Sequence, residues 1–334
     1  MPVDHSNFIE GVFRIQDASE FEPMALELFC HQAEHNNVYA TYLDMLKIQV
    51  ESIHEFEDIP FLPIEFFKSH QVVTGYWEPE AVFHSSGTSS DVVSKHQIKE
   101  LSVYRNSFIS GFRVAYGEPE SYIILCLLPN YADNPNSSLI YMTDELIKLS
   151  GQELSGYYLN QDDDLHKALK AGLKSSKKVL LLGVSYALLD LAERRDLPDM
   201  EKVIVMETGG MKGNRKEMVK EELHGALKRG LGVGEIHSEY GMTELLSQAY
   251  AKGNGIFTCP PWMRVTARDV NDPLKQIGLG RSGGLNIIDL ANVHSCAFIA
   301  TQDLGKVYAD GSFELLGRYD HSDIRGCNLL LAEG

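Results

Sequence analysis

A run of small, mostly hydroxyl-bearing residues lies shortly after the apolar segment 81–83. The run consists of Ser85, Ser86, Gly87, Thr88, Ser89 and Ser90, and Lys95 follows it. Small residues let backbone amides approach an anion, and hydroxyl groups add hydrogen-bond donors. The run therefore indicates a phosphate-binding loop, with Lys95 as an additional cation. The Gly-Lys-Ser/Thr ending of a Walker A loop is missing, and a plain polar turn is the alternative interpretation.

A second segment, 235–244, brings an aromatic ring, a hydroxyl group and a carboxylate close together in sequence. These belong to Tyr240, Thr243 and Glu244. A tyrosine ring can stack on adenine, and a carboxylate can hold Mg²⁺ together with substrate phosphates. The Thr243 hydroxyl can reach a phosphoryl oxygen. The alternative is a loop that leads into a helix, with Thr243 as its cap.

Other positions offer groups suited to a nucleoside. Gly209 and Gly210 follow a strongly apolar segment, and glycines there let a flat base lie against the backbone. Asp303 can accept hydrogen bonds from ribose hydroxyls, and Arg318 offers forked donors to ribose or phosphate. The simpler interpretations are a turn between a strand and a helix, a turn aspartate and a surface ion pair.

Cys327 lies close to the end of the chain, two residues after Arg325. A neighbouring cation favours the thiolate, which is the nucleophilic form of cysteine. The pair therefore forms a candidate nucleophilic site. An ordinary packed cysteine is the alternative.

These residues need elements to position them, and the pattern of apolar residues predicts an α/β fold. Residues 1–70 are expected to form a helical segment packed on the core. Residues 71–255 alternate between continuous apolar runs, such as 122–128 and 178–183, and helical stretches. This alternation is typical of a doubly wound parallel sheet that helices cover on both faces. The apolar stretch 61–67 is interpreted as packing, with a wall of an acyl pocket as the alternative.

The pattern of apolar residues changes after residue 255. Short, glycine-punctuated apolar segments over 256–320 predict a smaller β-rich subdomain that carries Asp303. Residues 321–334 form a short tail that carries Cys327.

The bulk properties exclude several classes of function. The formal net charge of −17 makes nucleic acid an unfavourable partner. No apolar run is long enough to span a membrane, and the polar start lacks the layout of a secretion signal. The five cysteines form no C-x-x-C pair, which speaks against a zinc ribbon or redox pair. A cytoplasmic location is expected.

Together the segments resemble the core motifs of the adenylate-forming superfamily, which includes acyl-CoA synthetases, luciferases and peptide-synthetase adenylation domains. The matching motifs are Ser-Ser-Gly-Thr (85–88), Tyr-Gly-Met-Thr-Glu (240–244), Asp-Leu-Gly (303–305) and Gly-Arg-x-Asp (317–320). Within the superfamily the chain is most similar to the acyl-protein synthetases, or long-chain-fatty-acid–luciferin-component ligases. The stretches that carry this likeness are 207–213, 238–250, 260–262 and 325–327.

The resemblance implies an ATP-dependent acid–thiol ligase. A fatty acid or other carboxylic acid and MgATP would give an acyl-adenylate, a thiol would take the acyl group, and a partner reductase or carrier protein would receive it. Cys327 corresponds to the acylated cysteine of the family. The larger superfamily has a mobile C-terminal domain with a catalytic lysine, and this chain is expected to lack that full domain; Lys212 or Arg325 could replace the lysine.

Two other functions stay open at the level of sequence. The protein could take acyl groups from CoA or a carrier protein without ATP, since the family's mobile domain is expected to be missing. It could also be a non-catalytic subunit that binds nucleotide or acyl groups, because Asp91 adds a negative charge beside the predicted phosphate loop.

Overall fold

The computed structural model of the chain describes residues 5–85, 93–130, 132, 134–209 and 218–318. Within them, a large sheet of twelve strands runs through the molecule. Eleven of its strands follow the order β11-β12-β13-β14-β10-β9-β8-β7-β6-β4-β5, and β1 pairs with β13 beside this path. A second, two-stranded sheet consists of β2 (Ala81–His84) and β3 (Lys95–Ile98). The fold is therefore α/β, with one large mixed sheet and one small one.

The parallel half of the large sheet contains the apolar runs that the sequence predicts as buried strands. Its strands are β4 (Tyr122–Leu127), β5 (Gly156–Tyr157), β6 (Lys178–Val184), β7 (Val203–Thr208) and β8 (Ile236–Tyr240). Side chains alternate between the two faces: Ile124 and Cys126 join one core, and Ile123 and Leu125 join the other. Both faces are buried, as continuous apolar strands require.

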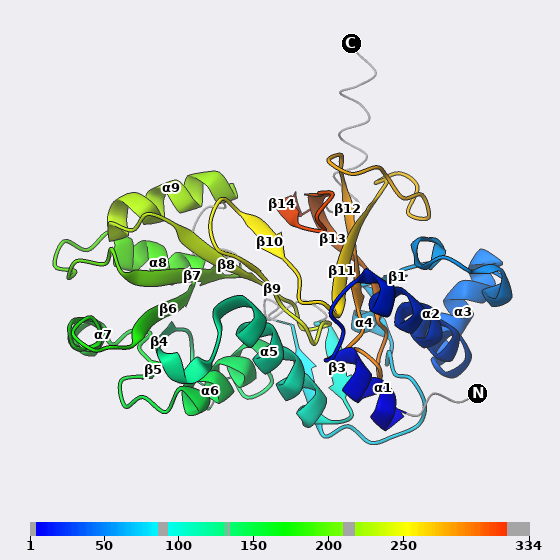
Figure 1. The fold of residues 1–334 in the computed structure, drawn as a ribbon, viewed down its shortest axis with the longest axis horizontal. Coiled ribbons are helices and arrows are strands. Elements are labelled where there is room, and N and C mark those ends of the chain that lie inside the picture. The colour runs from blue at the N-terminus through cyan, green and yellow to red at the C-terminus, as the bar shows by residue number, and fades with distance from the viewer. Residues whose placement is uncertain (1–4, 86–92, 131, 133, 210–217, 319–334) are drawn as a thin grey trace, which may run out of the picture.

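Helices cover both faces of this half, which confirms the doubly wound prediction (Figure 1). On one face lie α5 (Leu101–Tyr116) and α6 (Ser138–Ser150). On the other lie α7 (Asp162–Gly172), α8 (Ser185–Ala192) and α9 (Lys220–Leu231). Local sequence sets the ends of α6, because the Ser137 hydroxyl accepts from the Ile140 amide and Gly151 takes a left-handed conformation after its last turn.

The sheet becomes antiparallel at β8. The strands beyond it are β9 (Ala249–Ala251), β10 (Ile256–Thr258), β11 (Met263–Arg268), β12 (Ser282–Asp289), β13 (Phe298–Val307) and β14 (Phe313–Arg318). Strand β10 pairs with both β9 and β14, so the strands of the 256–320 segment continue the sheet of the 71–255 segment. Ligands in α/β sheets often bind at the carboxyl ends of strands where the topology changes. The end of β8 is such a point.

The N-terminal helices pack beside the antiparallel half (Figure 1). They are α1 (His5–Val12), α2 (Ala18–His35) and α3 (Asn37–Leu46). After α3 come 3₁₀ turns at Val50–Ser52 and Phe56–Asp58, then β1 (Leu62–Pro63) and α4 (Phe66–Ser69). Another 3₁₀ turn, Pro119–Ser121, directly precedes β4. The Gln32 amide donates to the Asn292 carbonyl at 2.9 Å, and β1 pairs in parallel with β13. Phe61 and Phe67 are buried in the core, where they serve packing.

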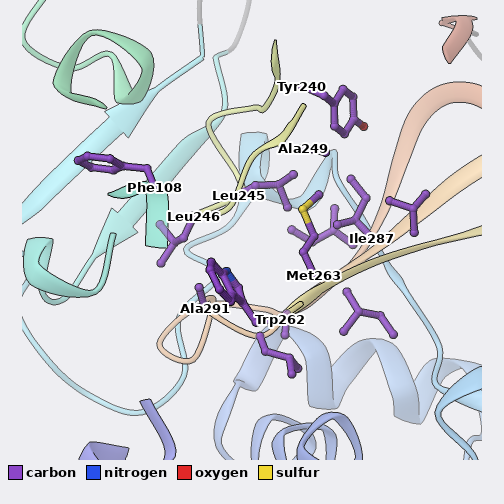
Figure 2. Close-up of a cluster of buried hydrophobic side chains, with 14 of the residues drawn as sticks. Phe108, Tyr240, Leu245, Leu246, Ala249, Trp262, Met263, Ile287 and Ala291 are labelled. Carbon is purple, nitrogen blue, oxygen red and sulfur yellow. The ribbon is translucent and has the colours of Figure 1, made fainter. Parts of the chain in front are cut away.

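A compact apolar cluster lies directly after the Tyr240–Glu244 segment. Figure 2 shows Leu245 and Leu246 in the same cluster as Trp262 and Met263, all of them almost fully buried. The Trp262 indole donates to the Ser247 hydroxyl at 3.0 Å. This packing anchors the chain that leaves the carboxyl end of β8. Among the described residues, none of the helices has both the length and the apolar character needed to cross a bilayer.

Candidate functional site

Three of the predicted nucleotide-binding residues meet at the junction of β8 and the β13–β14 pair. The Tyr240 hydroxyl donates to Asp303 Oδ2 at 2.7 Å, although 63 positions separate the two residues. Arg318 Nε lies 3.4 Å from Asp303 Oδ1. Burial raises the pKa of Asp303, and the Tyr240 hydrogen bond and the Arg318 charge oppose that rise. The carboxylate is thus held between a neutral donor and an exposed cation.

The local backbone of β13 explains how Asp303 takes this position. Asp303 pairs directly with Arg318 across the β13–β14 ladder, and the register shifts between Leu304 and Gly305. A side chain at Gly305 would collide with the Glu314 carbonyl oxygen, so only glycine allows the two strands to approach this closely. The irregularity re-aims the adjacent residues, as β-bulges do.

The Tyr240 ring is more enclosed than an open stacking platform. Only 6% of the residue is exposed. Its ring centroid lies 5.9 Å from that of Phe257 and 5.4 Å from that of Phe313, both in edge-on arrangements. These contacts fix the ring and direct its hydroxyl toward Asp303. Stacking of adenine on Tyr240 stays a prediction.

The ends of the predicted phosphate loop are tied together. The Ser85 amide donates to the Ser94 carbonyl at 3.0 Å, and the Ser94 amide donates to the Ser85 hydroxyl at 2.9 Å. Below these bonds His84 pairs with Lys95 in the β2–β3 hairpin, and Lys95 is exposed. Ser86, Gly87, Thr88, Ser89 and Ser90 lie outside the described residues. The residues on both sides of the loop are therefore held together at the end of the β2–β3 hairpin.

Glu244 lies beside these loop ends. Only 5% of the residue is exposed. Burial raises its pKa, while a hydrogen bond from Ser94 and the charges of Arg318 and Lys68 lower it. The carboxylate thus bonds to the base of the loop, and the charge of Arg318 stabilises its ionised form.

The donor set around Glu244 fits one kind of cation site. No cluster of three or more acidic, histidine or cysteine side chains that could hold a metal occurs in the part of the chain that the structure describes. Burial disfavours the ionised form of this single carboxylate, and a bound cation would stabilise it. Because only one carboxylate is present, the cation must receive its other ligands from the substrate. Mg²⁺ bound to substrate phosphates meets that description, so the residues present fit this ion.

His96, which the sequence interpretation did not select, positions Thr243. Its Nδ1 donates to the Thr243 carbonyl at 2.7 Å, and only 1% of the histidine is exposed. Burial lowers the pKa of His96 to about 4, so the ring is neutral near pH 7. Alternation along β3 is the signal that could have identified it, because His96 occupies an inward position between Lys95 and Gln97.

A buried acidic pair lies at the ends of β7 and β8. His224 and Lys220 contact Glu207 at 3.4 and 2.8 Å; burial raises the Glu207 pKa, but these partners outweigh burial and lower it to about 2. Glu239 accepts a short hydrogen bond from Thr208, and burial together with the nearby Glu207 charge raises its pKa to about 7. The sequence interpretation missed this pair, which only the β7–β8 register brings together.

Asp289, which the sequence interpretation also missed, holds the turn after Glu244. It accepts from the Leu246 amide at 2.8 Å, the Ser247 amide at 2.9 Å and the Ser247 hydroxyl at 2.6 Å. Asp289 is fully buried, and burial raises its pKa. Nothing in the local sequence links it to residues more than forty positions earlier.

The described site residues form two groups. Tyr240, Asp303 and Arg318 are in contact, and Glu244 bonds to Ser94, which is tied to Ser85. Gly209 directly follows β7, the strand next to β8, and its carbonyl accepts from the Ser185 hydroxyl at 2.8 Å. Gly210, Arg325 and Cys327 lie outside the described residues.

Comparisons with known proteins identify the family of the chain. The chain matches the family "Acyl-protein synthetase, LuxE" over residues 15–334. It is 22% identical to the long-chain-fatty-acid–luciferin-component ligase of Aliivibrio fischeri, and the alignment covers 93% of this chain and 87% of that protein.

Solved structures share the fold at low sequence identity. A 2-hydroxyisobutyryl-CoA ligase, crystallised with 2-HIB-AMP and CoA, aligns with a TM-score of 0.67 and 13% identity over 92% of this chain and 70% of its own. ATP-bound MatB from Rhodopseudomonas palustris aligns with a TM-score of 0.54 and 15% identity over 71% of this chain. This chain covers 48% of MatB, about half its length. The chain therefore shares the α/β fold of the N-terminal domain of adenylate-forming ligases, and the family match shows that it belongs to the LuxE acyl-protein synthetases.

Proposed function

We propose that the protein activates a carboxylic acid with ATP and transfers the acyl group to the thiol of Cys327. The observation that carries the proposal is the meeting of Tyr240, Asp303 and Arg318 near the end of β8. Segments far apart in the sequence supply a carboxylate that can accept from ribose hydroxyls, a cation, and a second carboxylate that can bind a metal ion. Nucleotides are recognised by such a combination.

Each predicted residue has a role in this scheme. Asp303 would accept from the ribose hydroxyls, and Arg318 would neutralise the charge beside it. The loop 85–90 and Lys95 would hold phosphates through amides, hydroxyls and one cation. Tyr240, with the Gly209–Gly210 turn, would border adenine. Glu244 would bind Mg²⁺, an ion that neutralises phosphate charge when bound.

The proposed reaction has two steps, adenylation of the acid and transfer of its acyl group to the thiol. An oxygen of the substrate carboxylate attacks the α-phosphorus of ATP, and the bond to pyrophosphate breaks, which leaves an acyl-adenylate. The Cys327 thiolate then attacks the acyl carbonyl, AMP departs with the bonding electrons, and the thiol proton goes to solvent. Thr243 would bond a phosphoryl oxygen, and Arg325 would favour the thiolate.

The substrate class is a fatty acid, and the receiver is a reductase or carrier protein. Support comes from the relative in Aliivibrio fischeri, whose name specifies a long-chain fatty acid. That relative is 22% identical to this protein, so the length of the preferred fatty acid must be measured directly.

A pocket beside the strand end offers room for the acyl chain. Its volume is about 430 Å³, and it lies between α5 and strands β9 and β10. Val114, Tyr250 and Ile256 are among the apolar residues that line it. Strand β9 pairs with β8, and the β9 residues of the pocket lie on the face of the sheet opposite the Tyr240 ring. The pocket reaches the end of β8 where Gln248 lies against Gly241.

The test is ATP–pyrophosphate exchange with a panel of fatty acids, followed by labelling with radioactive acid and MgATP. We expect exchange with at least one acid, and stable label on the wild type and on Cys30→Ala but not on Cys327→Ala. Cys30 is the matched control because it is an exposed free cysteine. Absence of exchange with every acid contradicts adenylation, and transfer from acyl-CoA without ATP would then support the acyltransferase alternative.

A further inference from the structure

Strand β13 is irregular at the point where it carries Asp303. The register of its pairing with β12 shifts between Gly284 and Asn286. The segment 301–303 of β13 therefore faces Leu285 alone. A bulge of this kind interrupts the regular ladder, and the backbone groups at the interruption need other hydrogen-bond partners.

The side chain of Arg268 supplies such partners. Arg268 belongs to β11, on the other side of β12 from β13, and only 4% of the residue is exposed. Its Nη1 donates to the Leu285 carbonyl at 2.6 Å and to Asn286 Oδ1 at 2.7 Å. Its Nη2 donates to the Thr301 carbonyl. The forked guanidinium group thus bonds to both strands where their ladder is interrupted.

Thr301 connects these bonds to Asp303. The Thr301 hydroxyl donates to the Leu285 carbonyl at 2.9 Å and accepts from the Asp303 amide at 3.1 Å. The backbone that directs the Asp303 side chain is therefore held by a network that contains the buried Arg268 side chain.

Arg268 also acts on Asp303 through its charge. Burial raises the pKa of Asp303, while the hydrogen bond from Tyr240 of β8 and the charges of Arg318 of β14 and Arg268 of β11 lower it. The Arg318 side chain is 71% exposed, so solvent screens its charge. Arg268 is buried and held by its hydrogen bonds, so its charge is screened less and stays in place.

We propose that Arg268 is a positioning residue for ribose recognition, because it fixes the bulge of β13 and provides a buried positive charge that keeps Asp303 ionised. The proposal rests on the proposed function in one respect, that Asp303 receives the ribose of ATP. An ionised carboxylate only accepts hydrogen bonds, as two ribose hydroxyls require, whereas a protonated carboxyl carries a donor of its own. An intact ribose should therefore bind more tightly than a 2′-deoxyribose.

The experiment separates the charge of Arg268 from its hydrogen bonds. Arg268→Gln keeps an amide that can donate to carbonyls but removes the charge, whereas Arg268→Lys keeps the charge. Arg264→Gln is the control, because Arg264 belongs to the same strand but lies over the Phe21 and Phe56 rings.

Two readouts are taken for each protein. Calorimetry gives the Kd of MgATP and of Mg-2′-deoxyATP at about pH 6 and pH 8.5. Nuclear magnetic resonance of protein with isotope-labelled aspartate gives the titration of the Asp303 carboxyl, whose signal is identified by its absence from Asp303→Asn.

We expect the wild type and Arg264→Gln to bind MgATP about 10-fold more tightly than its 2′-deoxy analogue, the size of one hydrogen bond to a charged group. In Arg268→Gln the pKa of Asp303 should be higher. The preference for ATP should then shrink at the lower pH and return at the higher pH, where the carboxyl is ionised. Arg268→Lys should keep the wild-type titration of Asp303 and the wild-type dependence of the preference on pH.

An unchanged titration of Asp303 in Arg268→Gln overturns the proposal. So does a loss of preference in Arg268→Gln that is the same at both pH values, since a purely structural role would give that result. If the wild type binds neither nucleotide, the proposed function and the ribose role of Arg268 fail together, whatever the carboxyl titration shows.

Discussion

In the proposed function, Asp303 is the residue on which nucleotide recognition is expected to depend most strongly. It is held by the Tyr240 hydroxyl at 2.7 Å and faces Arg318, yet burial disfavours its charge. Replacing it by asparagine keeps the shape but weakens hydrogen bonds that involve a charged group, each worth about 1.5–3 kcal/mol. We expect Asp303→Asn to lower kcat/KM for ATP in pyrophosphate exchange by about 10- to 100-fold.

The matched control for that substitution is Asp310→Asn. Asp310 is exposed in the turn before β14 and bonds only locally, to Ser312. Its variant should exchange pyrophosphate like the wild type. Equal activities of the two asparagine variants would remove Asp303 from the nucleotide site.

The raised pKa of Glu239 leads to a prediction about how folding stability depends on pH. Its pKa is about 7 in the folded protein against an ordinary value of 4.5, so the folded state binds the proton more tightly than the unfolded state. The stability from that proton is fully present below about pH 4.5 and is lost as the pH rises toward 7, up to about 3 kcal/mol. Glu239→Gln has no carboxyl to titrate. Urea unfolding between pH 4.5 and 7.5 should therefore show the wild type losing more stability than the variant, and parallel curves would contradict the account.

At the scale of elements, the turn after β8 depends on Asp289. This carboxylate accepts from three backbone amides, those of Leu246, Ser247 and Ala291, and from the Ser247 hydroxyl in a fully buried position. Asp289→Ala leaves these donors without their acceptor, at about 1–3 kcal/mol for each one that stays buried and unpaired. We expect a loss of about 3 kcal/mol or more in the free energy of unfolding, measured with urea. Asp289→Asn, which keeps one acceptor oxygen, should lose less, and a loss below about 1 kcal/mol in the alanine variant would show that other contacts hold the turn.

The elements themselves were largely predictable because their signals are local. The apolar run 122–128 corresponds to β4, and the helical stretch 138–150 corresponds to α6 with its serine cap and left-handed glycine. The Tyr240–Asp303 contact follows from no local signal. It requires the strand order β8-β9-β10-β14-β13 and an irregularity at Gly305, which are non-local consequences of packing.

The same limit applies to the residues that the sequence interpretation missed. His96 and Asp289 act through partners far along the chain, at Thr243 and Ser247. The resemblance to adenylate-forming enzymes identified the residues expected to touch ligands. It gave no access to the residues that hold those ligand-binding segments in place.

For the whole molecule, the proposal predicts that nucleotide binding stabilises the fold. A ligand at a hundredfold its Kd raises the free energy of unfolding by about 2.7 kcal/mol if it binds only the folded state. MgATP should therefore raise the melting temperature of the wild type, and the rise should be smaller for Asp303→Asn at the same concentration. Equal shifts for the two proteins would locate the nucleotide elsewhere. Stabilisation without pyrophosphate exchange would favour the non-catalytic alternative.

The most direct test of the central claim, that distant segments build one nucleotide site at the end of β8, is a crystal structure with Mg²⁺ and a non-hydrolysable ATP analogue. The account predicts ribose hydroxyls within hydrogen-bond distance of Asp303, phosphates beside Glu244 and the ends of the 85–94 loop, and a base bordered by Gly209 and Tyr240. An analogue bound away from Asp303 and Glu244 would contradict it.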